Sequence, residues 1–517
     1  MCGIAAIIYP HSNGEKEMSN MLKKIEHRGD SEPVQVGLGN SLLGSVRLKI
    51  VDRENAIQPI FNDSKTIGIV FNGEIYNYKT LKISLENKGY KFKTDSDTEV
   101  ILRLYEEYNY SFLLQLEGMF SFIIYDKTNN SFFGARDFFG VKPFYYCKNK
   151  ESYYVSSEMK SFLELDVETF EELKPGHFIT NNGITSYYQI PITKWNKDSF
   201  GNIKKKVRQL VETAVKKRVQ TDLPIATFLS GGLDSTIVHL LCCKYHPDVT
   251  ALIVGDDLGE DVIYAKRFCK DYNLKYKHIK SSNVNMVKSI AEVVYVIETF
   301  EPNPIRGSLL SMKLGELAKN EGFKVILCGE GCDEVFAGYG DFIGLTDENE
   351  FQNKILDLLA DLYRTQLLRL DKTSMRYSVE VREPFLDREL VEFALNIHPN
   401  MKVSKNDKGR LTTKSILREA FKDMLPDYIY YREKMTLMEG AGIGGVEKGK
   451  GLLNNYANSI LSEQEFNALI KNNPEYNLKD KEDALCFSIY NHLYSKAYFS
   501  KNRVINAQKE IIDAYEH

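Results

Sequence analysis

The stretch LPIATFLSGGLDSTIVHLLCC, residues 223–243, decides the fold of the larger part of this 517-residue chain. An apolar run, LPIATFL, leads into a glycine-rich turn, and an apolar helical pattern follows the turn. Two further apolar runs, VTALIVG (249–255) and FKVILCGEG (323–331), alternate with helical stretches in the same way. Strands that alternate with helices predict an α/β fold with a doubly wound parallel sheet and helices on both of its faces.

The turn SGGLDST, Ser230 to Thr236, predicts a phosphate site. A turn between a strand and a helix places backbone N–H groups and the positive end of the helix against a ligand. The turn lacks the Lys-Ser/Thr ending of a Walker A loop, which argues against γ-phosphate transfer. Its shape resembles the pyrophosphate-binding loop of N-type ATP pyrophosphatases, which cleave ATP to AMP and pyrophosphate. The alternative interpretation is an ordinary glycine turn capped by an aspartate.

A second glycine-rich turn, LCGEGCDEVFAGY (327–339), follows another buried strand and carries three carboxylates. Both turns should lie at the carboxyl ends of parallel strands, where such folds bind ligands. Asp234 and Asp333 could then share one Mg²⁺, because carboxylate oxygens are hard ligands. The alternative is a solvated acidic turn.

Residues 1 to about 190 have a different pattern, with short apolar or alternating runs broken by turns, among them GIAAIIY (3–9), SLLGSVRLKIV (41–51) and HFITNNGITSYY (177–188). The runs predict a β-rich region with helices near residues 79–88 and 97–109. The polar, broken string PITKWNKDSFG (191–201) predicts a linker, and helices are predicted at 201–219 and 235–245. Beyond about residue 345 the pattern is mostly helical, and GIGGVEKGKG (442–451) predicts a mobile loop.

The chain begins MCGIAAI, and Cys2 has two interpretations. In the first, it is a small apolar residue entering a buried strand. In the second, removal of Met1 gives Cys2 a free α-amino group, whose pKa near 8 suits a base, so that nucleophile and base share one residue.

Composition narrows the class of protein. A hydrophobic content of 43%, a charged content of 27% and a net charge of −4 are those of an ordinary globular enzyme and give no basic surface for nucleic acid. The eight cysteines show no CxxC pair and no zinc-ligand spacing, which favours reduced thiols in a cytoplasm. No apolar stretch reaches the ~18 residues that span a bilayer, and the start of the chain lacks a signal-peptide pattern, so we expect a cytoplasmic protein without membrane contact.

Four motifs in one order, MCGI, VFNGEIYNY (70–78), SGGLDS and GEGCDEVFAGY, make the chain resemble the glutamine-hydrolysing asparagine synthetases. The resemblance implies a class II glutamine amidotransferase domain at residues 1–190, an αββα sandwich of the N-terminal-nucleophile (Ntn) hydrolase type. It also implies an ATP-pyrophosphatase synthetase domain with added C-terminal helices at residues 200–517.

In this family the terminal cysteine attacks the glutamine amide, so the resemblance assigns Cys2 as nucleophile. Asn72 and Gly73 would stabilise the oxyanion. Arg47 would bind the substrate α-carboxylate, and Glu74 and Asp97 its amino group. Taken alone, Arg47 is more often a surface ion-pair residue, and Asn-Gly is more often a hairpin turn. The glutamine-binding residues implied are Arg47, Leu48, Lys49, Ile50, Val51, Asn72, Gly73, Glu74 and Asp97.

For the second domain the resemblance implies formation of β-aspartyl-AMP, with Lys434 in YREKMT stabilising the charge that builds on phosphorus. Glu330 would act on the intermediate and deprotonate ammonia, and an internal tunnel would carry ammonia between the domains. Asp234 and Asp333 would hold Mg²⁺. The ATP-binding residues implied are Phe228, Ser230, Gly231, Gly232, Asp234, Ser235, Val254, Cys328 and Gly329.

The expected activity is therefore ATP-dependent synthesis of asparagine from aspartate with glutamine as nitrogen donor. The expected partners are these small molecules, and a homodimer is compatible with the resemblance. One alternative is a related ligase for another carboxylic acid, because Asn303 and Pro304 stand where close relatives carry paired threonines beside Arg306. A second alternative is a glutaminase regulated by a nucleotide-binding region, and a third is a non-enzymatic scaffold.

Two further segments of the sequence bear on the expected activity. HRGDSEP (27–33) lacks the proline usual between glycine and aspartate in the family's glutaminase loop. Asp371, Arg382, Glu383 and Asp387 match the family's run beside the synthetase pocket, although each could equally be a structural ion-pair residue. The role of residues 445–517 is left open.

Overall fold

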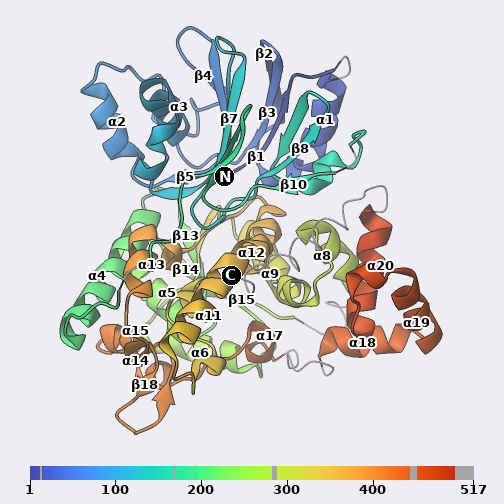
Figure 1. The fold of residues 1–517 in the computed structure, drawn as a ribbon. Coiled ribbons are helices and arrows are strands. Elements are labelled where there is room, and N and C mark those ends of the chain that lie inside the picture. Colours follow the sequence, from blue (N-terminus) through green and yellow to red (C-terminus); the bar gives the residue numbers. More distant parts are fainter. Residues whose placement is uncertain (12–13, 168, 193, 282–287, 443–450, 495–517) are drawn as a thin grey trace.

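Two six-stranded antiparallel sheets form the centre of residues 1–186, which we call the amino-terminal sandwich (Figure 1). The computed structural model describes residues 1–494 except 12–13, 168, 193, 282–287 and 443–450. The first sheet has the order β10 (Glu171–Glu172), β8 (Tyr145–Asn149), β9 (Ser152–Ser156), β1 (Cys2–Ile8), β3 (Ser41–Arg47), β2 (Val34–Leu38). The second has the order β12 (Gly183–Ser186), β11 (His177–Thr180), β7 (Ser131–Arg136), β6 (Gly118–Asp126), β5 (Ile67–Ile75), β4 (Ile60–Phe61).

The alternation of side chains along β1 explains the layers. Ile4, Ala6 and Ile8 face the second sheet and share a core with Val70 and Ile123. Ala5 and Ile7 point to the other face, where helix α1 (Gly14–Lys24) covers the sheet. Helices α2 (Tyr78–Glu86) and α3 (Asp97–Tyr108) lie on the outer face of the second sheet. The predicted αββα sandwich is confirmed.

The run SLLGSVRLKIV belongs to a strand only as far as Arg47. Strand β1 begins at Cys2, and Cys2 pairs with Arg47, so the sheet offers no partner beyond that residue. The chain from Leu48 onward leaves the sheet, and the Leu48 N–H donates to the Met1 carbonyl at 2.9 Å. The early end of this strand is what places residues 48–53 beside Cys2.

A five-stranded parallel sheet forms the centre of residues 200–494, which we call the α/β unit. Its order is β15 (Tyr276–Ile279), β14 (Val249–Val254), β13 (Ile225–Phe228), β16 (Val325–Leu327), β17 (Glu380–Arg382). Helices α4 (Phe200–Arg218), α5 (Leu233–Tyr245) and α6 (Glu260–Asp271) cover one face, and α8 (Ile290–Ile297), α9 (Pro302–Asn320) and α12 (Gln366–Met375) the other (Figure 1). This is the doubly wound sheet that the sequence predicts.

The rest of the α/β unit is largely helical, as the pattern predicts. Its helices are α10 (Cys332–Val335), α11 (Glu348–Asp361), α13 (Arg388–Leu395), α14 (Pro399–Lys402), α15 (Ser415–Phe421), α16 (Asp427–Tyr430), α17 (Leu437–Gly440), α18 (Leu452–Ile460), α19 (Glu463–Asn472) and α20 (Lys481–Tyr494). A small hairpin of β18 (Ser404–Lys405) and β19 (Leu411–Thr412) precedes α15. Of the loop predicted at 442–451, residues 443–450 lie outside the described residues.

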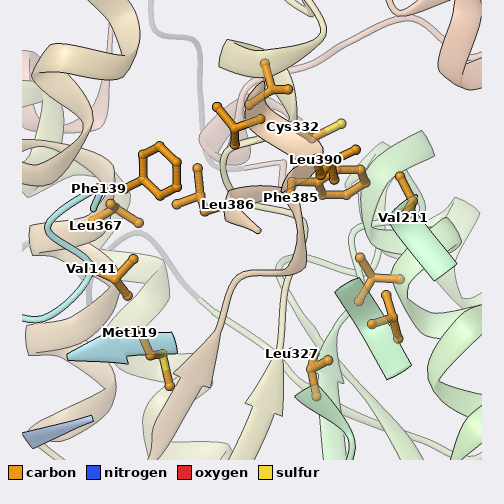
Figure 2. Close-up of a cluster of buried hydrophobic side chains, with 14 of the residues drawn as sticks. Met119, Phe139, Val141, Val211, Leu327, Cys332, Leu367, Phe385, Leu386 and Leu390 are labelled. Atoms are coloured by element: carbon orange, nitrogen blue, oxygen red, sulfur yellow. The ribbon is translucent and has the colours of Figure 1, made fainter. Parts of the chain in front are cut away.

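The sandwich and the α/β unit share one apolar layer. Met119, Phe139 and Val141 of the sandwich belong to the same buried cluster as Leu367 and Leu386 of the α/β unit (Figure 2). Because interiors are close-packed, this layer fixes the two parts against each other.

Ion pairs flank this layer. Arg28 binds Asp371 at 2.8 Å across the interface and Glu158 at 2.7 Å within the sandwich.

The described helices contain none that is both long and apolar enough to cross a bilayer.

Candidate active sites

Cys2 is buried at the start of β1, beside Asn72 of β5 and Gln58 of the loop before β4. Its backbone N–H donates to Asn72 Oδ1 at 3.0 Å, and Gln58 Nε2 lies 3.7 Å from its sulfur. Burial raises the pKa of the Cys2 thiol, while the adjacent ammonium of Met1 acts in the opposite direction. The thiol therefore needs a nearby base to become a nucleophile.

The string FNGE forms the wall beside this thiol. Asn72 is fully buried, and its Nδ2 has no hydrogen-bond partner among the described residues. Gly73 has φ of +152°, and a side chain there would place Cβ 2.1 Å from the Met119 carbonyl oxygen. A buried donor without an acceptor normally costs free energy. The amide is consistent with a donor that awaits an oxyanion formed at Cys2.

Three carboxylates surround the amino group of Met1. The ammonium binds Glu380 Oε2 at 2.9 Å, and Glu74 and Asp97 lie near it. Burial, reinforced by the charge of Glu380, raises the pKa of Glu74 to about 8, and burial also raises the pKa of Asp97. The sequence identified Glu74 and Asp97 but missed Glu380, which reaches this pocket from β17 of the α/β unit. The pocket is built to hold a cationic amino group.

The Arg47 guanidinium organises the loop that closes the same pocket. It donates to the carbonyls of Val51 at 2.6 Å, Asp52 at 2.8 Å and Arg53 at 3.1 Å. Leu48 and Ile50 are buried, whereas Lys49 is exposed and holds Asp30 through its backbone N–H. The structure thus brings the predicted residues 47–51 together beside Cys2.

A second cavity, of about 400 Å³, lies at the carboxyl ends of β13, β14 and β16. Most of the residues predicted for ATP line it: Phe228, Ser230, Gly232, Asp234, Ser235, Val254, Cys328 and Gly329. Glu330, Asp333 and Lys434 line it as well. Gly231 does not, but its φ of +66° and the Ala265 backbone, 2.6 Å from an added Cβ, require glycine there. The cavity has the size of a site for a small molecule.

The two predicted metal ligands face one point in this cavity. The ammonium of Lys414 binds Asp234 Oδ2 at 2.5 Å and Asp333 Oδ1 at 2.6 Å. Lys434 binds the other oxygen of Asp333 at 2.6 Å. Despite burial, the two ammonium groups hold the pKa of the Asp333 carboxyl well below its usual range. No sequence pattern points to Lys414, because a lone lysine in TTKSILR is unremarkable until the fold brings it here.

A charged end of the cavity lies between α9 and α12. Arg369 donates to Glu330 at 3.0 Å and to Ser311 at 2.8 Å. Arg306 and Asn303 line the same end. Arg369 was not among the predicted residues, although the motif that carries Glu330 was.

The run around residues 371–387 has structural partners instead. Asp371 binds Arg28 at 2.8 Å, and Asp387 binds Arg218 at 3.1 Å. Arg382 lies 3.4 Å from Glu74 of the sandwich, and burial raises the pKa of Glu383 to about 8. None of the four acidic and basic residues predicted here lines the 400 Å³ cavity. For Asp371, Arg382 and Asp387, the ion-pair interpretation fits the observed contacts.

Lys402 binds the acidic turn of residues 327–339 through a backbone carbonyl. It is buried, and its ammonium donates to the Val335 carbonyl at 3.0 Å, at the end of α10. Burial lowers the pKa of Lys402 to about 7. Above that pH, Lys402 is protonated in the unfolded chain but neutral in the folded chain, so raising the pH increases the free energy of unfolding. Below that pH, Lys402 is protonated in both states, and the folded chain bears the full cost of burying the ammonium.

We therefore expect wild type to gain stability relative to a Lys402→Met variant by up to about 1.4 kcal/mol per pH unit between about pH 7 and about pH 9. Thermal unfolding of both proteins across this range measures the gain. Lys422→Met, which removes a half-exposed lysine, is the control and should show no such trend. Parallel melting curves for wild type and Lys402→Met at every pH would contradict the prediction.

A buried cysteine at position 2 of an αββα sandwich, joined to a parallel sheet whose glycine turns line a cavity, defines a class: glutamine amidotransferases coupled to a nucleotide-dependent synthetase. Residues 1–221 match the family described as "Glutamine amidotransferase domain", and residues 206–358 and 344–485 match the family described as "Asparagine synthase". The chain belongs to the glutamine-hydrolysing asparagine synthetase family.

Individual relatives agree with this assignment. The chain is 33% identical over 491 residues to asparagine synthetase [glutamine-hydrolyzing] 1 of Arabidopsis thaliana, covering 90% of this chain and 82% of that protein. It is 34% identical to asparagine synthetase [glutamine-hydrolyzing] 3 of the same plant, with the same coverage. Among solved structures, glutamine phosphoribosylpyrophosphate amidotransferase from B. subtilis is similar with a TM-score of 0.32 and 18% identity, over 54% of this chain and 65% of that chain.

Proposed function

We propose that this protein makes asparagine from aspartate, ATP and glutamine, with residues 1–190 as the glutaminase domain and residues 200–517 as the synthetase domain. One observation carries the proposal. A buried thiol beside an unpartnered amide donor stands in the same chain as a cavity where two carboxylates and two ammonium groups converge. The first arrangement suits amide hydrolysis, and the second suits chemistry on a phosphate.

At the first site, the reaction begins when Met1 has been removed. The free amine of Cys2 then takes the thiol proton, and the thiolate attacks the side-chain carbonyl of glutamine. Asn72 Nδ2 and the Gly73 backbone N–H stabilise the tetrahedral oxyanion. The ammonium of Cys2 then gives its proton to the leaving nitrogen, so that ammonia departs, and water hydrolyses the thioester to release glutamate and restore the thiol. The carboxylates of Glu74 and Asp97 bind the substrate's amino group in the place that the Met1 ammonium marks, and Arg47 binds its carboxylate.

At the second site, the aspartate β-carboxylate attacks the α-phosphorus of ATP and pyrophosphate leaves. Lys434 and Lys414 lie where they can balance the charge that builds on the phosphates. Ammonia then attacks the acyl carbon of the β-aspartyl-AMP intermediate, Glu330 accepts a proton, and AMP leaves. Phe228, Val254, Cys328 and Gly329, which line the cavity, would surround the adenine.

Mg²⁺ fits this site. The carboxylates of Asp234 and Asp333 already share one cation, the ammonium of Lys414, so they approach each other closely enough to share another. Two protein carboxylates together with substrate phosphates are a usual Mg²⁺ environment. Bound there, the ion would neutralise phosphate charge.

Ammonia must pass between the sites without becoming ammonium. The apolar layer around Met119, Val141, Leu367 and Leu386 lies between the sandwich and the α/β unit (Figure 2) and supports a dry route. We also propose that the enzyme is cytoplasmic and that its partners are its small-molecule substrates. Whether two copies form a homodimer is left to measurement.

The test is transfer of labelled nitrogen. With ATP, aspartate, Mg²⁺ and glutamine labelled in its side-chain amide, the label should appear in asparagine, and AMP should form in equal amount. A panel of other carboxylic acids tests the alternative acceptor. AMP formation with an acid other than aspartate, and none with aspartate, would transfer the proposal to that acid; labelled ammonia without any AMP would favour the regulated glutaminase.

A further inference from the structure

The C-terminal helices reach the cavity through one ion pair. Glu482, near the start of α20, has no exposed surface and accepts from Arg306 of α9 at two atoms. The Nε–Oε1 distance is 2.6 Å and the Nη2–Oε2 distance is 2.7 Å. Arg306 lines the 400 Å³ cavity, whereas Glu482 lies behind it and does not. This is the side-on bidentate geometry in which a carboxylate fixes the plane of a guanidinium.

Helix α20 is firmly held where it makes this contact. Phe300, two residues before α9, packs against Tyr476, Phe487 and Tyr490. Helix α20 also packs on α8 and α18, in the group of helices at the right of Figure 1. The carboxylate of Glu482 is therefore a rigid support rather than a mobile surface group.

The pair leaves Arg306 with free donors. A guanidinium has five N–H groups. Glu482 takes two of them and Asn303 Oδ1 accepts a third from Nη1 at 3.1 Å. Among the contacts of the described residues, two N–H groups then remain, one on each terminal nitrogen. Two such donors are what a further carboxylate requires.

The position of Arg306 indicates which anion it meets. Its neighbour Gly307 lies against Arg369, because a Cβ added at Gly307 would fall 2.9 Å from Cδ of Arg369, and Arg369 binds Glu330. The phosphate-binding turn instead has Lys414 and Lys434 as its cations. Arg306 thus lies beside the Arg369–Glu330 pair, whereas the two lysines bind Asp234 and Asp333, and we assign the Arg306 part of the cavity to the amino-acid substrate.

We propose that Glu482 is a positioning residue for the acceptor: it orients the Arg306 guanidinium so that its remaining donors bind a carboxylate of the amino-acid substrate. This rests on the proposed function and gives the C-terminal helices a place in the synthetase site. It also gives Asn303, which departs from the family pattern, the task of holding the same guanidinium.

Steady-state kinetics of a Glu482→Gln variant test this. Glutamine keeps the shape and one acceptor but removes the charge, so we expect the KM for aspartate to rise about tenfold, with kcat and the KM for ATP within about twofold of wild type. Glutaminase activity should not change. Glu482→Asp, which restores the charge on a shorter side chain, should recover part of the loss.

A double-mutant cycle separates positioning from general stability. If Glu482 acts through Arg306, then Arg306→Ala combined with Glu482→Gln should raise the KM for aspartate no further than Arg306→Ala alone. Glu463→Gln is the matched control, because Glu463 pairs with Lys481 at the surface of the same helices. Its kinetics should equal those of wild type.

An unchanged KM for aspartate in folded Glu482→Gln, additive effects in the cycle, or an equal rise in the KM for ATP would overturn the inference. AMP formation by the wild type distinguishes a failure of this inference from a failure of the proposed function. If it forms AMP with another acid instead, the proposed function fails, and the KM for that acid tests Glu482 in its place.

Discussion

A Cys2→Ala variant should lose glutamine-dependent asparagine synthesis by about 10⁴-fold or more, yet make asparagine from ammonia at a rate within about twofold of wild type. The thiol is the only group that we assign to attack the glutamine amide, and alanine leaves the rest of β1 unchanged. The α/β unit, with its own cavity, does not contain this residue. Asparagine formation with glutamine, and separately with an ammonium salt at mildly alkaline pH, measures the two activities.

Cys147→Ala is the matched control. Cys147 is also buried in the first sheet of the sandwich, and burial raises the pKa of its thiol to about 12. Both activities should survive in this variant. Mass analysis of the purified wild type should show a chain that starts at Cys2, because a retained Met1 would occupy the acidic pocket. Loss of both activities in a folded Cys2→Ala protein would contradict the division into two sites.

An Asp234→Asn variant should show the reverse pattern. We expect AMP formation to fall by roughly 10³-fold, while glutamine hydrolysis at Cys2 continues. The substitution keeps the shape of the side chain but removes the negative charge that Asp234 and Asp333 share around one cation. An assay of AMP and pyrophosphate with ammonia as donor, at several Mg²⁺ concentrations, isolates this step.

Asp423→Asn serves as the control for that variant, since Asp423 forms an exposed ion pair with Arg208 in the same α/β unit. It should keep wild-type AMP formation. Chelation of Mg²⁺ by EDTA should reproduce the Asp234→Asn defect in the wild type and spare glutaminase activity. AMP formation in Asp234→Asn at the rate of the control would remove Asp234 from the phosphate site.

Much of the fold followed from local patterns. Strand β1, the hairpin of β11 and β12, and helices α4 and α5 lie within a few residues of their predicted bounds. These segments have strong hydrophobic periodicity and clear glycine or polar ends, so local sequence specifies them. The apolar pattern of residues 41–51 predicts a longer strand than β3, because the end of β3 depends on where β1 begins rather than on its own residues.

The sequence by itself determined the two glycine turns, the terminal cysteine and the carboxylate of FNGE, because each lies within a short motif whose chemistry is local. Only the tertiary structure decided that Glu380, Lys414 and Glu482 belong to these sites. Each reaches its partner across 100 residues or more: Glu380 meets Met1, Lys414 meets Asp234, and Glu482 meets Arg306. Such contacts form when separate elements bury their apolar faces together, and no periodicity along the chain records which charged side chains that packing will pair.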